Sequence, residues 1–143
     1  MATSSANVII PRNFKLLEEL ESSEKGQGDM SISMGLVNGD DIFLSDWNAS
    51  ILGPPGTPHD GRLYELRIFC SPEYPAVPPT VRFVTRINLS SVDQSNGVVT
   101  PDLPAIANWN RNMTIEAILV NLKNSMTSPQ NRRLPQPPEG SSF

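Results

Sequence analysis

The sequence contains very little cysteine and histidine. Cys70 is the only cysteine and His59 the only histidine among 143 residues. A single cysteine cannot form an internal disulfide, and a chain without a Cys/His cluster lacks the usual ligands of structural zinc. We therefore expect no metal site and no cofactor.

Long apolar runs, a secretory signal and positive net charge are also missing. Residues 1–7 are small and polar, without the basic start and apolar core of a signal peptide. The net charge is -4, and Arg132-Arg133 is the only adjacent basic pair, so the charge pattern of a nucleic-acid-binding protein is absent. We expect a protein inside the cell that binds neither nucleic acid nor a membrane.

The composition predicts one folded domain. Hydrophobic residues make up 38% and charged residues 18% of the chain, which is typical of a globular protein. A chain of this length can bury roughly two-thirds of its unfolded surface. We expect residues 1–7 to form a flexible tail and residues 8–143 to form the domain.

The first periodic segment predicts a helix over residues 11–24. Pro11 is suited to the first turn of a helix. At 100° per residue, Leu16, Leu17 and Leu20 cluster on one side, whereas Phe14 lies at the edge of that stripe. Phe14 is therefore a candidate for contact with something other than the core.

Four strands are predicted after this helix. Apolar and polar residues alternate over residues 30–34, 42–52 and 62–70, and Val81 and Phe83 mark a fourth strand. Asn38-Gly39 favours a tight hairpin turn, which makes the first two strands antiparallel. The predicted core face carries Met30, Ile32, Met34, Trp47, Ala49, Ile51, Tyr64, Leu66, Ile68 and Cys70.

A long aperiodic segment and a second helix complete the pattern. Residues 86–112 show neither period, and a loop of this length in a compact domain is usually functional. Thr114 is the predicted N-cap of a helix with an apolar stripe of Ile115, Ile118, Leu119, Leu122 and Met126. The order of helix, four-stranded antiparallel meander, long loop and C-terminal helix predicts an α+β fold.

Two motifs in the meander resemble the ubiquitin-conjugating (UBC-like) fold. They are Gly53-Pro54-Pro55-Gly56-Thr57-Pro58 and Tyr74-Pro75-Ala76-Val77-Pro78-Pro79-Thr80-Val81-Arg82-Phe83, with Gly61 between them. In that family the active site has a His-Pro-Asn tripeptide and then a Gly-x-Ile/Val-Cys segment. The corresponding stretches here are Leu89-Ser90-Ser91 and Gly97-Val98-Val99-Thr100. The resemblance therefore places Thr100 where the catalytic cysteine would stand.

This replacement implies a catalytically inactive protein. A thiol is partly ionised at neutral pH and strongly nucleophilic, whereas a threonine hydroxyl needs a base beside it. His59 lies in the Gly-Pro loop, which we interpret as a surface turn rather than a catalytic site. Cys70 has the phase of the core face, so we interpret it as a buried core residue.

Three further segments resemble the chain-building subfamily of ubiquitin-conjugating enzyme variants (UEVs). They are residues 11–20, the Asn108-Trp109 pair and residues 136–140. Like those variants, the chain lacks the last two helices of the full enzyme fold. The resemblance implies a heterodimer with an active ubiquitin-conjugating enzyme that holds acceptor ubiquitin and makes 63-linked chains. It also implies indirect work with a ubiquitin ligase, a role in DNA damage tolerance and signalling, and a cytoplasmic and nuclear location.

The subfamily resemblance assigns two binding surfaces. Periodicity alone would favour a tail folded over its own core and a solvated sheet face. The resemblance instead assigns conjugating-enzyme binding to Val8, Ile9, Ile10, Pro11 and Phe14, and acceptor-ubiquitin binding to Ser33, Asn48, Ser50 and Leu63. Asn48 and Ser50 differ from the residues typical of those positions, which implies an altered affinity for ubiquitin.

Two alternatives remain open from the sequence. One is a self-sufficient conjugating enzyme with an unusual nucleophile at Thr100 or Cys70. The other is a ubiquitin- and peptide-binding sorting adaptor, since another branch of the variants works in endosomal sorting. Separately, Tyr74-Pro75 is a candidate cis bond.

Overall fold

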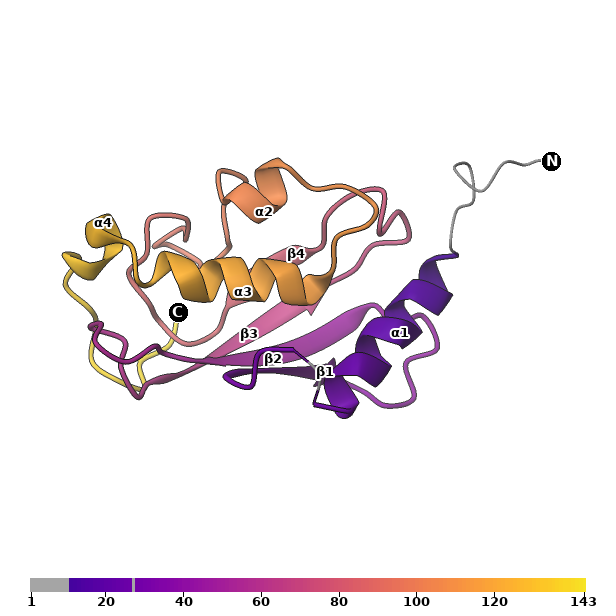
Figure 1. Ribbon diagram of the computed structural model, residues 1–143, viewed down its shortest axis with the longest axis horizontal. Coiled ribbons are helices and arrows are strands. Elements are labelled where there is room, and N and C mark those ends of the chain that lie inside the picture. Colours follow the sequence, from indigo (N-terminus) through magenta and orange to yellow (C-terminus); the bar gives the residue numbers. More distant parts are fainter. Residues whose placement is uncertain (1–10, 27) are drawn as a thin grey trace.

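The computed structural model describes residues 11–26 and 28–143, which form a helix, a four-stranded sheet and three further helices (Figure 1). The expected α+β order is confirmed, and the two short helices α2 and α4 were not predicted. The elements are α1 (Arg12–Glu24), β1 (Ile32–Leu36), β2 (Asp46–Leu52), β3 (Leu63–Phe69), β4 (Thr80–Phe83), α2 (Pro104–Ala107), α3 (Ile115–Ser125) and α4 (Pro129–Arg132).

The sheet is an antiparallel meander in the order β1-β2-β3-β4. Met34 faces Ala49, Ala49 faces Leu66, and Leu66 faces Phe83, so one row of inward side chains crosses all four strands. Period-two alternation puts every second residue on this inner face. The predicted alternation of β2 and β3 is confirmed, because Trp47, Ile51, Tyr64, Leu66 and Ile68 are all buried.

Helices α1 and α3 lie on the inner face of the sheet and enclose one core (Figure 1). The Thr114 hydroxyl accepts a hydrogen bond from the Ala117 backbone N–H at 3.1 Å, which confirms Thr114 as the N-cap of α3. The predicted stripe of this helix is also confirmed. Its five residues, Ile115, Ile118, Leu119, Leu122 and Met126, are completely buried.

Helix α1 faces the core differently from the predicted stripe. Leu16 is fully buried, but Leu17 is exposed, so its assignment to the buried side was wrong. The buried positions are Leu16 and Glu19, with Leu20 partly buried beside them. The buried face of α1 is therefore rotated from the predicted stripe toward Glu19, which leaves Leu17 exposed on the same side of the helix as Phe14.

The hairpin between β1 and β2 is looser than predicted. The strand begins at Ile32, and Met30 is 95% exposed rather than in the core. The connection spans residues 37–45, and the residue in it with a positive φ is Leu44 (53°), whereas Gly39 does not have one. The Asp41 carboxylate accepts backbone N–H bonds from Phe43, Ser45 and Asp46, which holds this loop together without a tight turn.

The long segment 86–112 is largely structural. Apolar side chains anchor it to the core, and two isolated β-bridges join Arg82 to Val98 and Val92 to Val99. The buried residues are Ile87, Leu89, Val92, Val99 and Leu103. The Tyr74–Pro75 bond is cis, as predicted. Within residues 11–26 and 28–143, no helix combines the length and the apolar character that crossing a membrane requires.

Candidate functional site

Cys70 follows β3 directly and lies inside the core. Its side chain is completely inaccessible to solvent. Burial raises the pKa of the Cys70 thiol to about 12, and the nearby Glu19 charge adds to the effect. A buried thiol that stays protonated cannot attack a thioester, so the interpretation of Cys70 as a core residue is confirmed.

His59 is also buried, and the expectation of a surface turn was wrong. Its Nδ1 lies 2.9 Å from the Tyr64 hydroxyl oxygen, and the two rings meet edge to face. The Gly-Pro loop folds inward because Gly53 lets the His59 backbone pack directly against it; a Cβ at Gly53 would collide with the His59 carbonyl group. Burial lowers the pKa of His59 to about 4, and the Arg62 charge acts in the same direction.

We expect stability to fall in mild acid because of His59. Its folded-state pKa lies below the ordinary value of 6.5, so its contribution is present above pH 6.5 and is lost as the pH falls toward 4. Linkage gives a loss of roughly 2 kcal/mol between pH 7 and pH 4.5. Urea unfolding at both pH values measures this, with His59→Asn as the control that cannot titrate. An equal loss in wild type and variant would contradict the assignment.

Thr100 lies in the loop between the Val92–Val99 bridge and α2. Its backbone N–H donates to the Ser91 carbonyl at 2.8 Å, and its hydroxyl donates to the Asp102 carboxylate. Threonine and serine nucleophiles are normally activated by a histidine or an amine. His59 is buried and bonded to Tyr64, so Asp102 is the acceptor that this hydroxyl has. Among the described residues, no cluster of Asp, Glu, His or Cys could hold a metal ion.

The predicted conjugating-enzyme surface is described only in part. Val8, Ile9 and Ile10 lie outside the described residues. Pro11 is exposed just before α1, and Phe14 is 63% exposed on its first turn. The structure thus places Phe14 where a partner could reach it, together with the exposed Leu17.

Two exposed apolar residues beside α1 were not predicted as part of a surface. Arg12 donates to the carbonyl oxygens of Phe43 (2.5 Å) and Cys70 (2.8 Å), which ties the β1–β2 loop to the start of α1. Ile42 and Phe43 project from this loop and are exposed. They had been assigned to the strand predicted over residues 42–52, although β2 begins only at Asp46. The sequence feature that could have indicated their exposure is the pair of adjacent apolar residues, which breaks the strict alternation of a half-buried strand.

The predicted ubiquitin-contact residues all lie on the outer face of the sheet. Ser33 faces Ser50 across β1 and β2, and their hydroxyl oxygens are 2.6 Å apart. Asn48 is exposed, and Leu63 is 59% exposed. These four residues line one shallow hollow with a volume of about 470 Å³. The face combines small polar side chains with one exposed leucine and is not covered by the described helices.

The fold matches known proteins. Residues 15–140 fit the profile of the ubiquitin-conjugating enzyme family. The fold resembles human ubiquitin-conjugating enzyme E2 G1, with a TM-score of 0.73 and 26% identity over 85% of this chain and 100% of that one. A putative ubiquitin-conjugating enzyme from Plasmodium yoelii gives a TM-score of 0.71 and 26% identity over 86% of this chain and 77% of that one.

Curated relatives narrow the classification. The chain is 49% identical to ubiquitin-conjugating enzyme E2 variant 1D of Arabidopsis thaliana, over 100% of this chain and 99% of that protein. It is 55% identical to ubiquitin-conjugating enzyme spm2 of Schizosaccharomyces pombe (94% and 97% covered) and 47% identical to ubiquitin-conjugating enzyme variant MMS2 of Saccharomyces cerevisiae (94% and 98%). The chain belongs to the ubiquitin-conjugating enzyme family and, within it, to the E2 variants.

Proposed function

We propose that this E2 variant is a catalytically inactive subunit that heterodimerises with an active ubiquitin-conjugating enzyme. In the heterodimer it holds acceptor ubiquitin without a covalent bond, and the pair builds 63-linked polyubiquitin chains. A ubiquitin ligase acts with the pair indirectly. In this proposal the protein acts in DNA damage tolerance and signalling, and it is located in both the cytoplasm and the nucleus.

The observation that carries the proposal is the burial of the only thiol. Conjugation requires an accessible cysteine that accepts ubiquitin as a thioester, and Cys70 is enclosed in the core with a raised pKa. Thr100 stands at the cysteine position of the family pattern, and the acceptor of its hydroxyl proton is a carboxylate rather than a histidine or an amine. The chain therefore depends on a partner for the chemical step.

A subunit of this kind can work by positioning alone. Fixing an acceptor amine beside a thioester converts a bimolecular encounter into an oriented, local reaction. Such a subunit needs one surface for the enzyme and another for the acceptor. Support for two surfaces comes from exposed apolar residues at the start of α1 and from the uncovered face of the sheet, which lies opposite the helices.

We expect this chain to form no adduct with ubiquitin. The test incubates it with ubiquitin, the activating enzyme and ATP, followed by a non-reducing gel. No band sensitive to reductant or hydroxylamine should appear on wild type, and Thr100→Ala should support chain synthesis at the wild-type rate within about twofold. An adduct that disappears in Thr100→Ala would instead establish a self-sufficient enzyme.

Reconstitution tests the positive part of the proposal. The chain is mixed with individual conjugating enzymes, the activating enzyme and ubiquitin, and the linkage of the products is read by mass spectrometry. Free 63-linked chains should form only when both the variant and one particular conjugating enzyme are present. Absence of a complex with every conjugating enzyme, together with binding to short proline-rich peptides, would favour the sorting adaptor.

A further inference from the structure

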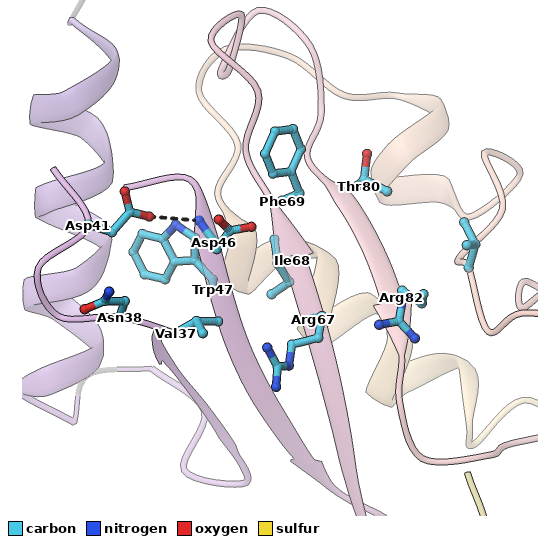
Figure 2. A pocket seen from close by; sticks show the side chains of 11 residues that line it. Val37, Asn38, Asp41, Asp46, Trp47, Arg67, Ile68, Phe69, Thr80 and Arg82 are labelled. Carbon is cyan, nitrogen blue, oxygen red and sulfur yellow. Dashed lines mark hydrogen bonds between the residues drawn. The ribbon is translucent and has the colours of Figure 1, made fainter. Parts of the chain in front are cut away.

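A second hollow lies on the outer face of the sheet, beside the one lined by the predicted ubiquitin contacts. Its volume is about 520 Å³, and Figure 2 shows the side chains that line it. Arg67 on β3 lines both hollows, so the two lie next to each other on the sheet. The second hollow carries a charge pattern that neither enzyme binding nor the predicted ubiquitin contacts explain.

Two arginines stand directly opposite each other in this hollow. Arg67 and Arg82 are cross-strand partners in the β3–β4 pair, and both are exposed on the same face (Figure 2). Like charges directly opposite each other destabilise an antiparallel pair. Within the described part of the chain, neither guanidinium group makes an ion pair or a side-chain hydrogen bond, although three lysines there form ion pairs. The fold thus tolerates an uncompensated repulsion here.

Among the described residues, the acidic side chains that line the hollow make no ion pair with these two arginines. The Asp41 carboxylate is engaged by the backbone N–H groups of the β1–β2 loop, and these hydrogen bonds lower its pKa. Asp46 lies on β2, opposite Phe69 and one row away from the arginines. Its negative charge disfavours an acidic group of a ligand close to Asp46. The part of the hollow that carries Arg67 and Arg82 is therefore the favourable position for a negative group.

We infer that this hollow is a docking site for a short acidic peptide segment of a partner protein. One carboxylate of the segment lies between Arg67 and Arg82, because guanidinium groups bind carboxylates with paired N–H donors. A neighbouring apolar side chain of the segment packs on the exposed Phe69 and Val37, which line the same hollow. Charge complementarity decides the partner's chemistry, since Arg67 and Arg82 lie opposite each other and neither makes an ion pair within the described residues.

The openness of the site favours a peptide over a small anion. Arg67, Phe69, Thr80 and Arg82 are all exposed, so the hollow cannot enclose a small molecule as ligand pockets normally do. An extended segment instead gains from contact along the whole surface. The proposal is independent of the proposed function, because it concerns the isolated chain and needs neither ubiquitin nor a conjugating enzyme.

The test uses two short peptides and two double variants. One peptide has two adjacent glutamates followed by a phenylalanine, and the other has glutamines in their place. Binding to the isolated chain is followed by two-dimensional NMR, which reports both affinity and location. The variant Arg67→Gln/Arg82→Gln is compared with Arg111→Gln/Arg133→Gln, which removes the same charge at exposed positions outside the hollow.

The expected result is binding of the glutamate peptide with amide shifts at residues 67–69 and 80–82. Its dissociation constant should rise at least tenfold in the Arg67→Gln/Arg82→Gln variant, stay within twofold in the control variant, and be at least tenfold lower than that of the glutamine peptide. The hollow variant should melt no lower than wild type, because it loses a repulsion. Absence of binding, equal weakening in both variants, or displacement by millimolar inorganic phosphate at the same residues would overturn the proposal.

Discussion

Phe14→Ala should weaken binding of this E2 variant to the proposed partner, a conjugating enzyme, by about 30-fold. Phe14 is 63% exposed on the first turn of α1, and its ring makes it a suitable anchor for a pocket on the partner. Truncation of such an anchor typically costs about 2 kcal/mol or more, and each 1.4 kcal/mol is a factor of about ten. Isothermal titration calorimetry with the purified partner measures the change directly.

The control for this prediction separates the two surfaces. Met30→Ala removes another exposed apolar side chain and should leave the affinity for the enzyme unchanged. Leu63→Ala and Ser33→Arg should also bind the enzyme normally, but they should slow chain synthesis because they alter the outer sheet face. If either sheet variant lost the heterodimer, the assignment of two separate surfaces would be wrong.

Chain topology could be predicted from the sequence because both periodicities are strong. The alternation in β2 and β3 and the stripe of α3 come from side chains that are all buried in one core. Thr114 was predictable as a cap because a hydroxyl before an apolar stripe has a specific hydrogen bond to make. Local chemistry and global packing agree in these elements.

The errors occur where polar groups or glycines decide the packing. Leu17 was assigned to the core because apolar periodicity cannot anticipate that Glu19 would be buried instead. His59 was assigned to the surface because its burial depends on two contacts that periodicity does not indicate, the packing against Gly53 and the bond to Tyr64. The Arg67–Arg82 pair becomes visible only when the strand register is known.

Glu19 itself connects three parts of the fold. Its carboxylate accepts hydrogen bonds from the Tyr74 hydroxyl at 2.5 Å and from the Ile115 backbone N–H at 2.7 Å, and Lys15 lies 3.8 Å away. It thereby joins α1 to the Pro-rich link and to the first residue of α3. Burial raises the pKa of this carboxyl, with the hydrogen bonds and Lys15 opposing the shift, and burial also raises the pKa of Tyr74, which remains a donor.

Glu19→Ala should therefore destabilise the fold by about 4 kcal/mol, since two buried donors would each lose a partner at about 2 kcal/mol apiece. Glu19→Gln keeps one acceptor oxygen and should lose about half as much. Adding Tyr74→Phe to Glu19→Ala should cost less than the sum of the two single changes, because no hydroxyl is then left unpaired. Urea unfolding of wild type, the three single variants and the double variant measures these differences.

The pH dependence gives a second, independent readout for Glu19. A carboxyl whose folded-state pKa lies above its ordinary value of 4.5 contributes most below that pH, and the contribution is lost as the pH rises through the folded-state pKa. The stability advantage of wild type over Glu19→Gln should thus be larger at pH 4.5 than at pH 7. His59 is present in both proteins, so its contribution to the pH dependence of stability cancels when the two are compared. An advantage that grew with pH would mean that Lys15 and the two hydrogen bonds outweigh burial at this site.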